Sequence, residues 1–310
     1  KRHGTVRAVD GVSFDIAQGE TFGLVGESGC GKTTVGRTLI RAHRPTSGEM
    51  LFSPTEEESH DLVQLRDKDL LPLRTEMQMI FQDPYSSLSP RMTVKQIVGE
   101  PLIIHKRAAG SELEARVEQT LATVGLDPGH LNRYPHAFSG GQRQRIGLAR
   151  ALIINPKFIV ADEPVSALDV SVQAQILELF VKLKEEYGLS YLFVSHDLSV
   201  VRYISDRVAV MYVGKLVELA PSKVLFDTPR HPYTRALISV VPIPDPHRRD
   251  EPELLEGEVA DAANPPPGCL FHPRCKFARE RCRVEEPTLR NIAGEDAPHI
   301  IACHFAEEIS

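Results

Sequence analysis

The sequence predicts an α/β fold with a parallel sheet, because short apolar runs alternate with stretches of helical periodicity. Phe158–Ala161 and Tyr191–Val194 are wholly apolar, as is typical of strands buried on both faces. Between them, apolar residues recur at helical spacing from Val172 to Tyr187. A third predicted strand, Thr21–Val25, runs into a glycine-rich turn and a helix from about Lys32 to His43.

Further elements follow from local signals. Gly11–Ile16 has a strand-like pattern, and a capping box at Ser111 and Glu114 predicts the start of a helix. Another helix is expected from Gly141 to Ile153. The stretch from Asp83 to Gln142 lacks strand patterning, so a helical subdomain is expected over about residues 83–150.

Composition excludes several classes of protein. With 42% hydrophobic and 25% charged residues, the chain is expected to be soluble and globular. No apolar run reaches the roughly 18 residues that a membrane span needs, and no secretory signal follows Lys1. The 36 basic and 42 acidic residues give a net charge of −6, the wrong sign for a non-specific nucleic-acid binder.

The last 70 residues differ from the rest. From Val241 onward there are 14 acidic and 8 basic residues, so the whole net charge lies there, with 10 of 23 prolines and four of five cysteines. We therefore expect a boundary near Val241–Pro246, between a domain of residues 1–240 and an extension of residues 241–310.

A phosphate-binding motif, G-x-x-x-x-G-K-[ST], follows the strand Thr21–Val25. Its glycines allow backbone N–H groups to converge on phosphate oxygens at a helix N-terminus. Lys32 is expected to reach the β- and γ-phosphates, and the Thr33 hydroxyl to bind Mg²⁺. A kinase, a GTPase and a transport ATPase all fit the motif, and a turn without a ligand is the structural alternative. The predicted nucleotide-binding residues here are Gly26, Glu27, Ser28, Gly29, Cys30, Gly31, Lys32, Thr33 and Thr34.

Two carboxylates follow the apolar run Phe158–Ala161. Asp162 is placed to hold Mg²⁺ through water, and Glu163 to polarise an attacking water as a general base. The alternative is that both merely cap the next segment.

Four more elements accompany these carboxylates. Ser139, Gly140, Gly141 and Gln142 open a helix and offer backbone N–H groups to an anion. Asp169 follows the carboxylates, and His196 ends a strand where a γ-phosphate contact is wanted. Gln82 follows another apolar strand. Taken alone, a plain loop-to-helix start and a structural histidine are the simpler interpretations.

In this order and spacing, these elements resemble the ATPase subunits of ABC transporters across residues 1 to about 240. The resemblance implies a P-loop NTPase core with a helical subdomain, and ATP and Mg²⁺ as cofactors. It also implies that Gln82 senses Mg²⁺ and water, that Asp169 lies in the D-loop and that His196 is the switch histidine. Ser139–Gln142 resemble the signature motif, preceded by Phe138 where leucine is commoner. In a head-to-tail pair, this signature closes on the nucleotide of the opposite subunit.

The adenine-stacking aromatic residue of the family normally precedes Val6–Ile16. Only His3 stands there, so the aromatic residue is expected upstream of Lys1. This fits a trimmed chain or the C-terminal half of a tandem ATPase.

Two further segments, Gln82–Met92 and Arg230–Leu237, resemble those of oligopeptide, dipeptide and nickel importers. The resemblance implies an ATP-hydrolysing subunit that powers peptide import, bound peripherally to the cytoplasmic face of the inner membrane. Its implied partners are a second ATPase subunit or domain, two transmembrane permease subunits and, indirectly, an extracytoplasmic peptide-binding protein, with no nucleic acid. Tyr85–Met92 is expected to meet a membrane subunit. The alternatives are a soluble ABC-type ATPase of DNA repair or translation and a nucleotide-binding regulatory module.

The cysteines of the extension are spaced C-x₅-C-x₆-C-x₂₀-C, and free thiols, disulfides, zinc and an iron–sulfur cluster all compete. Reducing cytosol disfavours disulfides. Zinc sites usually contain tight C-x₂₋₄-C pairs, which are absent, although His272, His299 and His304 are substitutes. A segment this poor in apolar residues cannot build its own core, which favours stabilisation by a bound metal. Resemblance to peptide-importer ATPases implies a [4Fe–4S] cluster with a structural or sensing role, held by Cys269, Cys275, Cys282 and Cys303.

Overall fold

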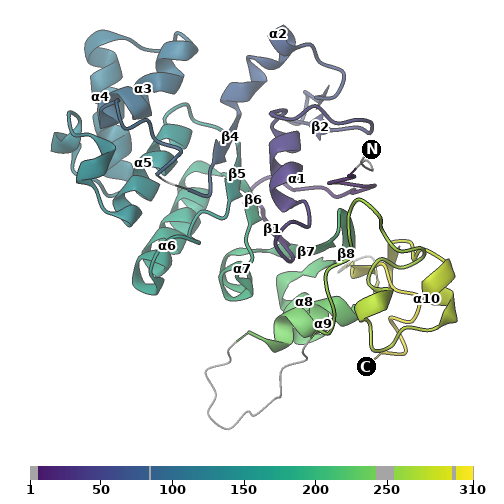
Figure 1. Cartoon of the computed structure of the whole chain (residues 1–310). Coiled ribbons are helices and arrows are strands. Elements are labelled where there is room, and N and C mark those ends of the chain that lie inside the picture. The colour runs from purple at the N-terminus through teal and green to yellow at the C-terminus, as the bar shows by residue number, and fades with distance from the viewer. Residues whose placement is uncertain (1–5, 84, 242–254, 295–297, 310) are drawn as a thin grey trace, which may run out of the picture. The chain divides into compact units, whose positions relative to one another are not determined.

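A computed structural model of the chain describes residues 6–83, 85–241, 255–294 and 298–309 (Figure 1). The chain divides into two compact units. The expectations for His3 and for most of the boundary Val241–Pro246 lie outside the described residues. Unit 1 contains Lys1–Ile16, Thr21–Val35 and Ser195–Ser310, and unit 2 contains Ala17–Glu20 and Gly36–Val194.

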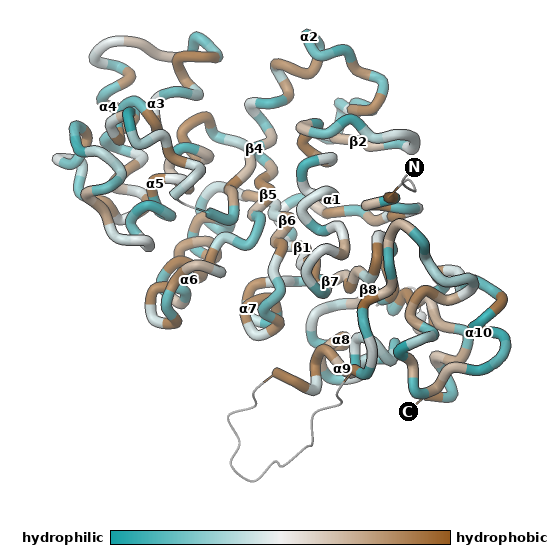
Figure 2. Tube along the Cα trace, in the orientation of Figure 1, coloured by the Kyte–Doolittle hydropathy of each residue, from teal (hydrophilic) through white to brown (hydrophobic). Residues whose placement is uncertain are grey.

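Unit 2 contains three parallel strands in the order β4–β5–β6. Ile80 of β4 (Met77–Ile80) lies opposite Ala161 of β5 (Phe158–Asp162), and Asp162 lies opposite Val194 of β6 (Ser190–Val194). Hydrophobic residues dominate these strands (Figure 2), and β6 is buried along its whole length. The parallel arrangement predicted from the wholly apolar runs is therefore confirmed.

The described chain between β4 and β5 contains helices and turns and no strand, as the missing strand pattern predicts. Thr93 and Gln96 form a capping box that begins α3. The helical elements of unit 2 are α2 (Asp67–Leu70), η1 (Leu73–Thr75), α3 (Val94–Ile104), α4 (Gly110–Thr123), η2 (Pro128–His130), η3 (Pro135–Ala137), α5 (Gly140–Leu152) and α6 (Val170–Tyr187). A small hairpin pairs β2 (Leu51–Phe52) with β3 (His60–Asp61).

Two predictions about local structure are wrong. α4 begins at Gly110, so Ser111 lies in its first turn, and the N-cap residue Ala109 offers no side-chain bond. Gly11–Ile16 forms no strand. It is held instead by side chains: the Phe14 ring stacks on Phe22 with centroids 4.9 Å apart.

The described residues of unit 1 form five strands in the order β1–β7–β8–β10–β9. β1 runs parallel to β7, whereas β7, β8, β10 and β9 are successively antiparallel. The strands are β1 (Thr21–Val25), β7 (Arg207–Tyr212), β8 (Lys215–Pro221), β9 (Arg290–Asn291) and β10 (Ile300–Ile301). The helical elements are α7 (Leu198–Ile204), α8 (Ser222–Asp227), α9 (Pro232–Ser239), η4 (His272–Arg274) and α10 (Glu280–Val284), while α1 (Lys32–Leu39) divides between the units.

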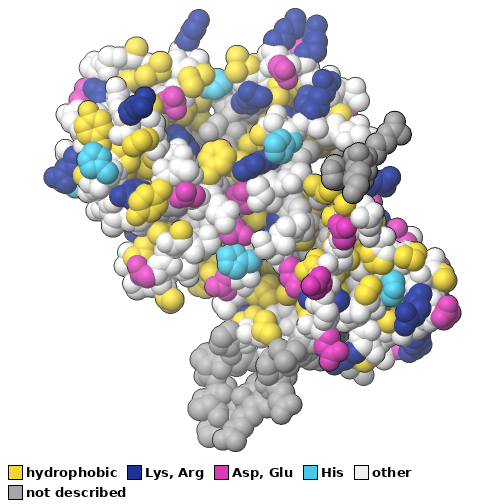
Figure 3. Space-filling model, in the orientation of Figure 1, with side chains coloured by type: hydrophobic (Ala, Val, Ile, Leu, Met, Phe, Trp, Pro, Cys, Tyr) yellow, Lys and Arg dark blue, Asp and Glu magenta, His cyan; other side chains and the backbone are white. Residues whose placement is uncertain are grey.

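The extension packs against the strands of unit 1. Phe271 is buried, and its ring centroid lies 5.4 Å from those of Tyr212 on β7 and Tyr233 on α9. Ile300 of β10 pairs with Leu219 of β8. The extension therefore contributes large apolar residues to a core that it shares with the strands of unit 1. Its charged side chains are interspersed by sign on the surface (Figure 3).

No helix in the described ranges combines the length and the apolar character that a membrane span requires.

Candidate functional site

The phosphate-binding motif forms a tight turn between β1 and α1 in unit 1. Gly26 and Gly31 have φ angles of +149° and +108°, which other residues rarely adopt. A Cβ atom at Gly26 would lie 2.1 Å from the Met211 carbonyl oxygen, and one at Gly31 would lie 2.1 Å from the Ala8 carbonyl oxygen. Only glycine fits at these two positions, because other backbone segments approach the loop too closely.

Lys32 is buried, and its ammonium group folds back over the loop. Nζ donates to the carbonyl oxygens of Gly26 at 2.7 Å and Glu27 at 3.1 Å. Thr33 and Thr34 lie half-buried in the first turn of α1, where the predicted Mg²⁺ and phosphate contacts require them. The structure thus places a cation and a helix N-terminus around one short loop, an arrangement suited to polyphosphate.

Cys30 is buried in the same loop. Burial raises the pKa of its thiol above the ordinary value. A protonated, buried thiol is a poor nucleophile, which fits the prediction that Cys30 serves by its small size.

The carboxylate pair lies in unit 2, at the carboxyl end of β5. Asp162 is buried, and Glu163 has a φ of +46°, a left-handed conformation that is strained for a residue with a side chain. The Glu163 N–H donates to the Val194 carbonyl oxygen at 2.9 Å, which holds the turn. Gln82 Nε2 donates to Glu163 Oε2 at 2.7 Å, so the structure brings together two of the predicted site residues.

The predicted signature motif begins α5 with a full capping box. The Ser139 hydroxyl accepts from the Gln142 N–H at 3.3 Å, and the Gln142 side chain accepts from the Ser139 N–H at 3.0 Å. Gly140 and Gly141 form the first turn. At Gly141 a Cβ atom would lie 2.4 Å from Val172 Cγ1, so α5 and α6 meet at a position where only glycine fits.

Asp169 and His196 occupy helix and strand ends. Asp169 caps α6 by accepting from the Val172 N–H at 3.1 Å, and it also accepts from the Ser171 hydroxyl at 2.7 Å. The Ser171 bond, followed by the Val172 bond, lowers the pKa of Asp169. His196 is exposed just after β6 and belongs to unit 1, as does the phosphate-binding loop.

The four extension cysteines are free thiols that line one cavity. Burial raises the pKa of Cys269 to about 12 and that of Cys275 to about 11, and it also raises the pKa of Cys303. Within the described ranges, no three His, Cys, Asp or Glu side chains are grouped as a metal site requires. The described thiols therefore share a cavity but are not grouped as a metal site requires.

The histidines considered as zinc ligands have other partners. His299 Nε2 lies 2.6 Å from Oε1 of the fully buried Glu218. His272 Nδ1 lies 2.9 Å from the Cys269 carbonyl oxygen, and His304 Nε2 lies 2.9 Å from that of Glu285. His272 and His304 nevertheless line the cysteine cavity, whereas His299 does not.

Sequence reasoning missed two residues that contact the phosphate-binding loop. Arg274 binds the Glu27 carboxylate, and Tyr233 binds the Glu27 backbone. No local pattern indicates either contact, although Tyr233 lies in the segment Arg230–Leu237, because each residue pairs with Glu27 from more than 200 positions away.

Comparison with known proteins agrees with this geometry. The family model described as ABC transporter matches residues 9–166, about half of the chain. The chain belongs to the ABC transporter family, and it is an ATPase of that family. Residues 217–282 match the model described as oligopeptide/dipeptide transporter, C-terminal region, which assigns the chain to that branch.

Relatives and solved structures support the same assignment. The chain is 51% identical over 308 residues to the oligopeptide transport ATP-binding protein AppF of Bacillus subtilis, covering 98% of this chain and 91% of that protein. It is 55% identical over 276 residues to OppF of the same organism, covering 86% and 89%. The post-hydrolysis dimer of the cassette MJ0796 with ADP and phosphate matches with a TM-score of 0.61 at 32% identity, over 69% of this chain and 90% of that one.

Proposed function

We propose that this chain is the ATP-hydrolysing subunit of a multi-subunit importer of peptides. The observation that carries the proposal is the match of the chain to peptide-transport ATP-binding proteins over almost its full length, extension included. We propose as its partners a second ATPase subunit or domain arranged head to tail, two transmembrane permease subunits and, indirectly, an extracytoplasmic peptide-binding protein. The proposed location is peripheral, on the cytoplasmic face of the inner membrane.

We assign each predicted motif a role in the proposed ATP site. Lys32 would bind the β- and γ-phosphates, while Thr33, Gln82 and Asp162 would hold Mg²⁺ directly or through water. Their oxygen-rich donor set suits a hard cation. Bound Mg²⁺ would neutralise charge on the phosphates.

Hydrolysis is assigned to Glu163 as the general base, with His196 contacting the γ-phosphate. The bond from Gln82 to Glu163 supports this assignment, because Gln82 would then contact both Mg²⁺ and the general base. The partner's Ser139–Gln142 turn and Asp169 would complete the site across the proposed dimer, as the exposed Asp169 cap permits. Peptide import is then coupled to opening and closing of the pair.

The test is reconstitution with candidate permease subunits in vesicles loaded with ATP. Uptake of a labelled oligopeptide is expected for the wild type and should vanish with Glu163→Gln, which retains nucleotide binding. ATP hydrolysis with no co-purification of membrane subunits would instead favour a soluble ATPase. Binding without any hydrolysis would favour a regulatory module.

We propose in addition that Cys269, Cys275, Cys282 and Cys303 hold a [4Fe–4S] cluster. Four thiols that line one cavity are a donor set suited to iron–sulfur ligation, although the described side chains are not grouped as a metal site requires. A bound cluster would cross-link the extension and supply no step of ATP hydrolysis. Burial raises the pKa of Cys269 and Cys275, so these thiols would release protons when metal binds.

Iron and sulfide analysis of anaerobically purified protein tests this second proposal. About four irons and four sulfides per chain, with a brown visible spectrum, are expected. A colourless sample that contains zinc, or one that contains no metal, would overturn it.

A further inference from the structure

We infer that the C-terminal extension positions the phosphate-binding loop, and that Arg274 is the residue through which it does so. The inference rests on the proposed ATP site and adds to it a residue that lies far from the motif in sequence. Arg274 touches neither nucleotide nor metal in this role. It acts through Glu27, the second residue of the motif.

The contact is a two-point ion pair. Arg274 Nη1 donates to Glu27 Oε2 at 2.7 Å, and Nη2 donates to Oε1 at 3.1 Å. The Arg274 side chain is 6% exposed and that of Glu27 is 26% exposed, so solvent screens this pair less than an exposed pair. Two parallel bonds fix the orientation of both groups.

The backbone of Glu27 is held from the same region of the chain. Its N–H donates to Tyr233 Oη at 2.8 Å. Tyr233 and Arg274 both lie within the 217–282 segment that distinguishes the peptide-transporter branch. One residue of the loop is thus held at its side chain and at its main chain by elements outside the nucleotide-binding motifs.

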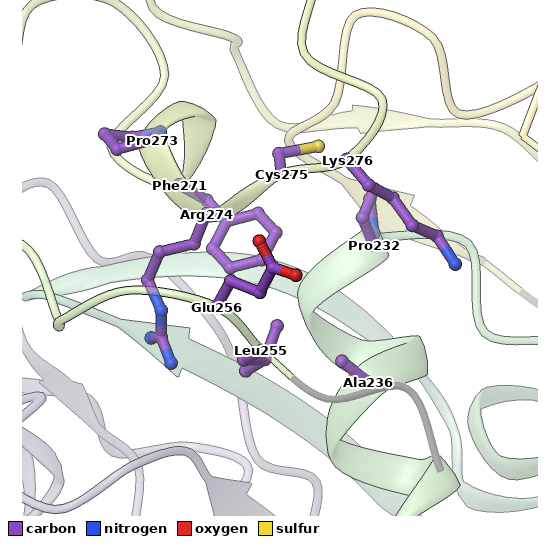
Figure 4. A pocket seen from close by; sticks show the side chains of 9 residues that line it. All are labelled: Pro232, Ala236, Leu255, Glu256, Phe271, Pro273, Arg274, Cys275 and Lys276. Carbon is purple, nitrogen blue, oxygen red and sulfur yellow. The ribbon is translucent and has the colours of Figure 1, made fainter. Parts of the chain in front are cut away.

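The extension in turn fixes Arg274. This residue ends the η4 turn, where its N–H donates to the Phe271 carbonyl oxygen at 3.0 Å. Phe271 packs on Tyr212 and Tyr233. Cys275 comes next, and the two side chains leave the turn in different directions (Figure 4). The same turn therefore presents a thiol to the cysteine cavity and a guanidinium to the loop.

Charge explains why the pair matters for nucleotide. A lone carboxylate beside a polyphosphate site repels the ligand, and the Arg274 guanidinium neutralises it. Without Arg274, the Glu27 carboxylate would lose both its neutralising partner and the contact that fixes its position. Both effects lower the affinity of the loop for ATP.

The experiment measures binding of a fluorescent ATP analogue with Mg²⁺ to the full chain. Arg274→Gln is expected to raise Kd about tenfold. Made on top of Glu27→Gln, the same substitution should change Kd less than twofold, because the partner is already gone. Equal effects in both backgrounds, or no effect in the wild type, would overturn the inference.

Three controls make the outcome specific. Arg279→Gln breaks another ion pair of the extension, with Glu308 at 2.8 Å, and should leave Kd within twofold. Arg274→Lys retains charge but not the two-point geometry, so an intermediate Kd is expected even if Arg274→Gln folds poorly. Lys32→Ala separates the two proposals: if it binds nucleotide normally, the proposed ATP site fails. If Lys32→Ala loses binding and both Arg274 variants retain it, only the present inference fails.

A readout independent of affinity is amide hydrogen exchange at residues 271–275. Coupling between sites is reciprocal, so bound nucleotide should slow exchange in this turn of the wild type. The slowing should be lost in Glu27→Gln at saturating nucleotide. Exchange that ignores nucleotide in the wild type would contradict the inference.

Discussion

Tyr233 Oη accepts a hydrogen bond from the Glu27 N–H at 2.8 Å, although 206 positions separate the two residues. Tyr233 is fully buried on α9, and its hydroxyl reaches this backbone group. Burial raises the pKa of Tyr233 well above the ordinary value, which keeps the hydroxyl protonated at all working pH values.

Tyr233→Phe is therefore expected to destabilise the protein by about 1–2 kcal/mol, because it leaves a backbone N–H without its acceptor. Urea unfolding measures this loss. Tyr187→Phe removes a hydroxyl from an exposed side chain and should leave stability within about 0.5 kcal/mol. Equal stabilities for the wild type and Tyr233→Phe would show that water replaces the tyrosine.

Glu163→Gln is expected to lower ATP turnover about 100-fold or more while retaining ATP affinity, because the amide cannot accept the proton of an attacking water. Phosphate release and nucleotide binding are measured on the same sample. Glu186→Gln, on the exposed face of α6, is the matched control and should hydrolyse ATP normally. Undiminished hydrolysis by Glu163→Gln would remove this residue from the mechanism.

Two glycines of α5 should respond in opposite directions to alanine. Gly141→Ala places a methyl group 2.4 Å from Val172 Cγ1 and is expected to destabilise by about 1–3 kcal/mol. Gly147→Ala meets nothing within 4 Å and is expected to stabilise by up to about 1 kcal/mol through helix propensity. Thermal unfolding of the two variants compares the cost of steric crowding with the gain in helix propensity within a single helix. A stabilising Gly141→Ala would mean that α5 and α6 separate easily.

Acid should destabilise the protein through His231. Burial lowers the pKa of His231 to about 4, with Glu218 opposing the shift, and Nδ1 accepts from the Tyr233 N–H at 3.1 Å. The unfolded chain protonates near pH 6.5, so it binds more protons between pH 6.5 and 4. His231 therefore removes about 3 kcal/mol of stability as pH falls through that window.

His231→Asn can still cap α9 through its oxygen but cannot titrate. Urea unfolding at pH 7 and at pH 4.5 should show a smaller difference between the two pH values for this variant than for the wild type. Equal differences would mean that other groups carry the acid sensitivity.

Local signals predicted the parts of the fold that depend on short segments. β1 has the predicted bounds, and β5 and β6 match theirs to one residue. An apolar run flanked by polar residues can be buried in only one way, so its ends are well defined. The capping box at Ser111 failed because the N-cap residue is Ala109, two positions earlier. A two-residue change in a helix start alters every capping role but barely alters the periodicity.

The candidate site could be predicted where a motif directly follows a strand. The loop around Lys32 and the strained turn at Glu163 both follow strands, so their positions follow from the sheet. The pairing of Arg274 with Glu27 and that of His299 with Glu218 were not predictable. They join residues 247 and 81 positions apart, and a single sequence contains no record of such tertiary pairs.

The two-residue strand β10 has a consequence for truncated proteins. Ile300 and Ile301 bond to one edge of β8, while β7 covers the other. A chain cut near residue 240 would leave that edge of β8 with unpaired N–H and C=O groups, which invite strands from other molecules. The extension thus also protects this edge from pairing with other molecules. A chain without it should aggregate rather than form a free ATPase domain.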